Sequence, residues 1–166
     1  MAGSIINRLI MFVTLLLVQV LVLNHVWLFN VATPLLYVFF VITFPRNSAK
    51  GEVLAWSFCL GLMVDLFSNT PGMASGTMTL VALLQPYLLE LYVPRDSAEN
   101  LEVTSATLGW TKYLTFSLIL TFLYCLVFFA LEAFNFFEWQ LWLLRTVGST
   151  VLTMVLMIAI DSVRSK

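Results

Sequence analysis

Apolar residues occur in long stretches along this chain, and short polar connections separate one stretch from the next. Most stretches approach the length of about 20 residues that an α-helix needs to cross a hydrocarbon core roughly 30 Å thick. The pattern therefore predicts an all-α bundle of about six transmembrane helices. They fall within residues 5–24, 26–44, 53–67, 73–93, 113–131 and 139–160.

Prolines interrupt two of these stretches. Proline lacks a backbone N–H, and lipid cannot replace the hydrogen bond that is lost. Pro34 therefore predicts a kink or a late helix start in the second stretch, which leaves five spans as an alternative to six. Pro86 predicts a kink in the fourth. Residues 94–111 mix polar and apolar side chains and are expected to lie at the membrane surface.

Composition agrees with a membrane protein. Hydrophobic residues make up 61% of the 166 residues and charged residues 10%, with a mean hydropathy of +0.97. A water-soluble globule needs more polar surface than this chain supplies. The length predicts a single transmembrane domain over residues 1–166. The net charge of −1 lacks the basic excess of a nucleic-acid-binding protein, so no nucleic-acid partner is expected.

The basic residues predict the orientation, because cytoplasmic loops collect Lys and Arg. With six spans and a cytoplasmic N-terminus, almost all of the basic residues fall on one side, so both termini are expected in the cytoplasm. These residues are Arg8, Arg46, Lys50, Arg95, Lys112, Arg164 and Lys166. Arg145 is the exception and falls toward the external side.

Residues that carry chemistry are sparse. The two cysteines, Cys59 and Cys125, lie inside apolar stretches, and no spacing typical of metal ligands is found, so no metal or cofactor is expected. His25 falls in the first external turn, where a solvated turn residue is the main interpretation and a proton sensor the alternative. No nucleophile elbow, phosphate-binding loop or HExxH sequence occurs, so the chain is not expected to be an enzyme.

The stretch from Gly61 to Gly76 departs from plain apolar helix. Gly61 and Asp65 are four residues apart and share a helix face, and the turn with Pro71 and Gly72 follows. Gly61, Gly72 and Gly76 are expected to permit close helix approach, because small residues favour packing in membranes. The stretch therefore predicts a helical hairpin with one carboxylate near its external end.

Arg145 is the expected partner of Asp65. Counted at about 1.5 Å per residue, the two side chains lie at similar depths below the external surface. An unpaired charge at the centre of a membrane helix costs about 2.5–3.5 kcal/mol on insertion scales, which favours a pair between the third and sixth helices. A structural ion pair or a snorkelling arginine is the first interpretation. A partner-binding or gating role and a proton or substrate relay are the alternatives.

The chain resembles the rod shape-determining membrane protein MreD family. The family's Gly-x-x-x-Asp element and Pro-Gly turn correspond to Gly61, Asp65, Pro71 and Gly72, and Gly76 follows. The first cytoplasmic turn, with Arg46 and Lys50, also agrees. As architecture the likeness covers nearly the whole chain, whereas as a motif it rests on about sixteen residues, 61–76.

The resemblance implies a non-enzymatic scaffold in the bacterial cytoplasmic (inner) membrane that supports peptidoglycan synthesis and rod cell shape. It implies direct binding to the bitopic protein MreC, within a complex that includes MreB, RodA and a class B penicillin-binding protein, in contact with membrane lipid. In fold, the family is similar to the substrate-binding subunits of energy-coupling-factor transporters. A vitamin-type transporter subunit is therefore the alternative function.

The hairpin around Asp65 and Gly72 is the expected contact surface for MreC, with Arg145 holding the hairpin in place. Residues 94–110 are a second hypothesis, for contact with cytoplasmic filament components, against the simpler interpretation of a solvated loop. The transporter alternative instead predicts an externally open pocket in which several polar groups converge on a small molecule.

Overall fold

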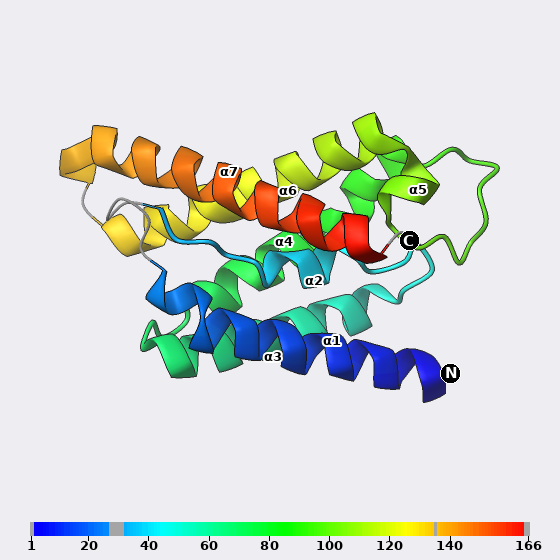
Figure 1. The fold of residues 1–166 in the computed structure, drawn as a ribbon, viewed down its shortest axis with the longest axis horizontal. Coiled ribbons are helices and arrows are strands. Elements are labelled where there is room, and N and C mark those ends of the chain that lie inside the picture. The colour runs from blue at the N-terminus through cyan, green and yellow to red at the C-terminus, as the bar shows by residue number, and fades with distance from the viewer. Residues whose placement is uncertain (1, 27–31, 135, 165–166) are drawn as a thin grey trace.

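The computed structural model describes residues 2–26, 32–134 and 136–164, and their regular secondary structure is helical (Figure 1). Long helices dominate, and short helical turns connect them. The long helices are α1 (Ala2–Leu21), α3 (Lys50–Ser68), α4 (Met73–Tyr92), α6 (Trp110–Ala133) and α7 (Trp139–Arg164). The short ones are η1 (Leu23–His25), α2 (Val38–Ile42), α5 (Ser105–Leu108) and η2 (Phe136–Glu138).

Four helical stretches in the described residues are long and apolar enough to cross a membrane: Gly3–His25, α3, α6 and α7. The chain is thus an all-α protein with the features of a membrane protein. Helix α4 also has 20 residues and continues through Pro86, but it is not among these four stretches. The hydropathy pattern located all five long helices to within a few residues.

The second apolar stretch does not form the predicted spanning helix. Only the five residues of α2 are helical, and residues 33–35, just before it, are not. Proline disfavours the helical conformation in the residue before it and has no N–H to donate, so the late helix start predicted from Pro34 is confirmed. Every residue of α2 is at most 2% exposed. Its apolar sequence therefore serves the protein core and not a lipid-facing surface.

The long helices form two antiparallel pairs. Helix α3 packs along α4, and α6 packs along α7. Helix α4 also contacts α6 and so joins the pairs, while α1 lies against α3. Figure 1 shows α1 and α3 along one side of the molecule, α6 and α7 along the other, and α2 between them. Large side chains of this interior are fully buried, among them Tyr37, Phe40, Tyr113, Phe116 and Tyr124.

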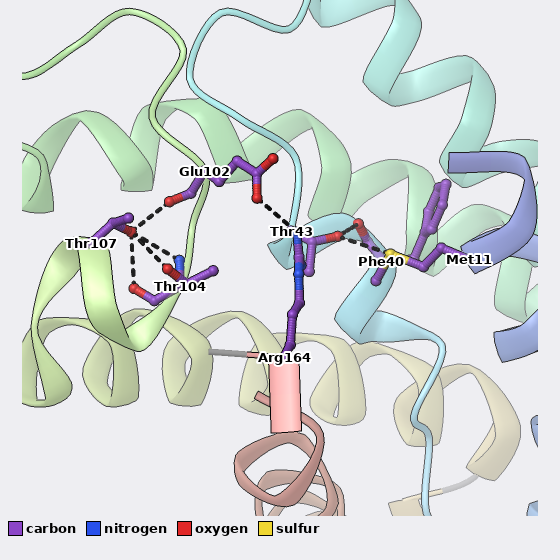
Figure 2. A network of polar contacts seen from close by, with 7 residues as sticks. All are labelled: Met11, Phe40, Thr43, Glu102, Thr104, Thr107 and Arg164. Atoms are coloured by element: carbon purple, nitrogen blue, oxygen red, sulfur yellow. Dashed lines mark hydrogen bonds and ion pairs between the residues drawn. The ribbon is translucent and has the colours of Figure 1, made fainter. Parts of the chain in front are cut away.

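Both termini lie toward the same end of the bundle (Figure 1). Arg8 of α1 pairs with Glu52 at the start of α3 and donates a hydrogen bond to Ser48. Arg164, at the end of α7, pairs with Glu102 at 3.1 Å, and Figure 2 shows this contact beside the capping residues Thr104 and Thr107 of α5. The positive charges predicted for one side gather here, except that Lys166 lies outside the described residues. We call this the terminal end, and the other the distal end.

Candidate functional site

Asp65 lies in α3 and caps the N-terminus of the next helix, α4. Its two carboxylate oxygens accept hydrogen bonds from the backbone N–H groups of Ala74 (2.8 Å) and Ser75 (2.9 Å), and from the Thr70 hydroxyl (2.9 Å). The first N–H groups of a helix have no partner within the helix and carry its positive dipole end. The residue at the N-cap position of α4 is Gly72, which has no side chain to cap with, so the buried Asp65 supplies the acceptor from α3.

Gly61 brings the two helices of this hairpin into contact. A Cβ atom added at Gly61 would lie 2.5 Å from the Ser75 Cα and 2.8 Å from both the Ala74 carbonyl oxygen and the Ser75 nitrogen. Only a glycine fits against backbone at this distance. Neighbouring positions on one face of α3 therefore fix the start of α4. Gly61 lets the first turn of α4 approach, and Asp65, four residues later, accepts hydrogen bonds from that turn.

The turn of the hairpin uses two residues in the left-handed region. Asn69 ends α3 with φ 57°, and Gly72 precedes α4 with φ 81°. The backbone N–H of Thr70 donates to the Asp65 carbonyl oxygen at 3.1 Å, which closes the end of α3. Pro71 and Gly72 are exposed, so the Pro-Gly turn forms the tip of the hairpin.

Gly76 does not have the packing role predicted for it within the chain. It lies on the exposed side of α4, and a Cβ added there would meet nothing within 4 Å. Gly72 likewise has open space and serves through its backbone conformation. Of the three glycines of this stretch, only Gly61 makes the close helix approach.

The predicted ion pair between Asp65 and Arg145 is wrong. Arg145 pairs instead with Glu132 of α6, with 3.9 Å between Arg145 Nη1 and Glu132 Oε1. Arg145 and Thr70, which donates to Asp65, line one cavity at the distal end, but Asp65 itself does not line it. The predicted pair does not form because the nearby helix N-terminus satisfies the Asp65 carboxylate without a cation. Arg145 therefore does not hold the hairpin in place.

A second set of polar side chains supports the extended segment before α2. The Gln19 side chain donates to the Pro34 carbonyl oxygen at 3.0 Å and accepts the Leu36 N–H at 3.0 Å. From α7, Ser149 accepts the Thr33 N–H at 3.2 Å, and Thr153 accepts the Leu35 N–H at 3.1 Å. Irregular backbone at membrane depth must find partners inside the protein, and these side chains provide them.

The sequence analysis did not single out these residues. The available signals were a glutamine inside an otherwise apolar helix and the hydroxyls of Ser149 and Thr153 at helical spacing. Asp161 was also missed as a buried group: it is fully buried, and its Oδ2 accepts the Ser105 N–H at 3.2 Å. Asp65 and Asp161 thus both use backbone N–H groups at the start of another helix as partners.

A cavity of about 470 Å³ opens at the distal end, between the α1–α3 side and the α6–α7 side of the bundle. Polar side chains contribute much of its lining, while phenylalanines and aliphatic residues contribute the rest. The polar ones are Asn24, His25, Thr33, Tyr37, Ser68, Thr70, Glu132 and Arg145. Tyr37 also forms a hydrogen bond, between its hydroxyl and that of Tyr124. The exposed His25 faces this cavity, consistent with its expected place in a solvated turn.

These features define a polytopic α-helical membrane protein with a locked helical hairpin and, at one end, a cavity that polar and apolar side chains line together. Comparison with protein-family models, with curated proteins and with solved structures found no match for this chain. The resemblance to the MreD family therefore rests on the Gly61–Gly76 stretch and on the architecture.

Proposed function

We propose that this chain is a non-enzymatic scaffold of the bacterial inner membrane that binds MreC and supports cell-wall synthesis and rod shape. In this proposal MreB, RodA and a class B penicillin-binding protein are further members of the complex. The family resemblance suggests the role, and the geometry of the α3–α4 hairpin supports it.

The observation that carries the proposal is that one side of each hairpin helix packs against the other helix while an adjacent side is exposed. Gly61 and Asp65 lock the two helices together from within, while the residue after each of them, Leu62 and Leu66, is exposed. Gly76 likewise follows the packed Ser75 and is exposed. In an antiparallel helix pair, positions that follow packed residues lie on the same side of the pair. The hairpin therefore presents an apolar face on which Gly76 has no side chain, and small residues of this kind suit the packing of another transmembrane helix.

The same proposal places six passes across the membrane. The five long helices supply five of them, and residues 32–44 supply the sixth. Residues 32–35 are extended and most of residues 36–44 are turn or helix, so four residues at about 3.3 Å each and nine at about 1.5 Å each span roughly 27 Å, close to the thickness of a hydrocarbon core. The positive terminal end then faces the cytoplasm, as the distribution of Lys and Arg favours.

Substitution of Gly76 by Leu tests the hairpin surface. The added side chain meets open space in this chain, and Leu is the better helix former by about 0.8 kcal/mol, so the protein should fold normally. It should nevertheless obstruct a partner helix. We expect Gly76→Leu to lose copurification with MreC and to fail to restore rod shape in cells depleted of the native protein.

Gly51→Leu is the matched control, because Gly51 is also exposed, helical and without neighbours within 4 Å, but lies at the terminal end. It should copurify normally. Unchanged copurification and normal rod shape with Gly76→Leu would contradict the proposal. Asp65→Ala is a less specific test, because it also removes the cap of α4.

The distal cavity favours a second candidate, the substrate-binding subunit of a vitamin-type transporter. Cavities of about 300–1,000 Å³ with a few polar groups are typical of small-molecule sites. This function predicts that a vitamin raises the unfolding temperature of the purified protein. Complex formation with MreC and loss of rod shape on depletion would instead favour the scaffold, and a neighbouring gene for MreC would support it.

A further inference from the structure

The distal cavity is lined by one positively and one negatively charged side chain, and both can contact a ligand. Arg145 of α7 and Glu132 of α6 line the 470 Å³ cavity and also an adjoining one of about 390 Å³ that has Phe129 in common with it. Their closest atoms are 3.9 Å apart, beyond hydrogen-bond distance. The side chains are 36% and 44% exposed. The pair is therefore loose and open to the cavity.

From this geometry we infer that the distal cavity binds a zwitterionic group, with its anionic part on Arg145 and its ammonium on Glu132. A half-exposed ion pair contributes little to stability, so separating the two side chains around a ligand costs little. An unpaired charge is costly where water is scarce. A zwitterion keeps both side chains compensated, whereas a simple anion would leave Glu132 without a cation and a simple cation would leave Arg145 without an anion.

The rest of the lining fits a small polar group with an apolar attachment. The hydroxyls of Thr33 and Ser68 line the cavity and can donate hydrogen bonds to oxygen atoms of the ligand, whereas the Thr70 hydroxyl already donates to Asp65. Phe128 and Phe129 supply aromatic surface, against which an ammonium group is attracted. At the rim, Leu21 and Phe67 are 65% and 62% exposed, so an acyl chain could leave the cavity along apolar surface.

The shared chemistry, a phosphate or carboxylate near a primary ammonium, has two sources. One is the headgroup of phosphatidylethanolamine in the adjacent leaflet, and the other is a soluble zwitterion such as phosphoethanolamine. The inference does not rest on the scaffold role, since the hairpin face at Gly76 and this cavity use different residues. Loss of MreC copurification in Gly76→Leu should leave zwitterion binding intact.

The test compares the full-length protein with the double variant Arg145→Gln/Glu132→Gln. This variant removes both charges at nearly constant volume and leaves neither unpaired, so its unfolding temperature without ligand should match that of the parent. Arg95→Gln/Glu99→Gln, exposed at the terminal end, is the matched control. The lipid arm measures retention of phosphatidylethanolamine and phosphatidylglycerol by native mass spectrometry. The soluble arm measures the shift in unfolding temperature with phosphoethanolamine and with inorganic phosphate.

We expect selective binding of a zwitterionic probe in at least one arm, weakened about tenfold in the double variant, as the loss of charge-assisted contacts implies. The control should bind like the parent. Selectivity in the lipid arm alone identifies a headgroup site, and selectivity in the soluble arm alone identifies a soluble ligand. Equal binding of phosphatidylglycerol or phosphate, absence of binding in both arms, or undiminished binding by the double variant would overturn the inference.

Discussion

Gly61 and Asp65 of α3 both act on the first turn of α4, one by having no side chain and the other by accepting hydrogen bonds. The first turn of α4 needs an acceptor for its free N–H groups, and it lies so close to α3 that no side chain fits between the backbones. A carboxylate meets the first demand and the absence of a side chain meets the second. The i, i+4 spacing follows because both residues must face the same neighbour. The motif is thus explained by the hairpin itself, without a ligand.

Gly61→Ala should destabilise the protein by about 1–3 kcal/mol, the usual range for overpacking, because its Cβ meets backbone atoms that cannot rotate away. Gly76→Ala is the control, since its Cβ meets open space, and it should be neutral or slightly stabilising. Thermal unfolding of both variants in the same detergent measures the difference. Equal unfolding temperatures for the two variants would show that α3 and α4 are not in backbone contact at Gly61.

At the scale of elements, the segment of residues 32–44 is the least expected part of the molecule. It has the composition of a membrane helix but forms an extended stretch and a five-residue helix inside the bundle. Three of its backbone N–H groups are bound by side chains of α1 and α7. Polar residues in apolar helices are often assigned to function, but here they stabilise irregular backbone at a depth where water is scarce.

Gln19→Leu tests this account of the segment. The variant keeps a side chain of similar size but leaves the Leu36 N–H and the Pro34 carbonyl without the partner they have now. An unsatisfied buried group costs about 1–3 kcal/mol, so the free energy of unfolding should fall by at least that amount. Thr14→Leu, at an exposed position of the same helix, is the control and should unfold like the parent. A parent-like unfolding temperature for Gln19→Leu would contradict the assigned role.

At the scale of the whole molecule, the two ends differ in charge and in the presence of a cavity. The terminal end gathers basic residues in ion pairs such as Arg8–Glu52 and Arg164–Glu102, while the distal end has the hairpin tip and the cavity with Arg145 and Glu132. If the terminal end lies in the cytoplasm, as proposed, the cavity opens to the outside of the membrane. Contact with cytoplasmic components and ligand binding would then occur on opposite sides.

Cysteine labelling in intact cells tests this orientation. In a background with Cys59 and Cys125 replaced by alanine, Pro71→Cys should react with a membrane-impermeant maleimide. Asn47→Cys and Asp96→Cys should react only after the cells are permeabilised. The reason is that Pro71 lies at the exposed hairpin tip, whereas Asn47 and Asp96 lie in loops at the terminal end. The reverse labelling pattern would show that the distal end faces the cytoplasm.

The sequence by itself determined the class and the long helices of this protein. Apolar stretches of sufficient length mark α1, α3, α4, α6 and α7, because helix formation in a membrane depends on local composition and length. The turn at Pro71 and Gly72 and the late start of α2 were also local properties of proline and glycine. The gathering of basic residues predicted which loops share an end.

The tertiary structure decided what each polar or small residue contacts. Hydropathy cannot distinguish an apolar residue that faces lipid from one that faces protein, so the burial of α2 was not visible in the sequence. Depth alone gave Asp65 an incorrect partner, because a helix N-terminus competes for the carboxylate only once α3 and α4 are packed together. The cavity at Arg145 and Glu132 likewise is lined by residues of several helices that are far apart in the sequence, so only the packing of those helices creates it.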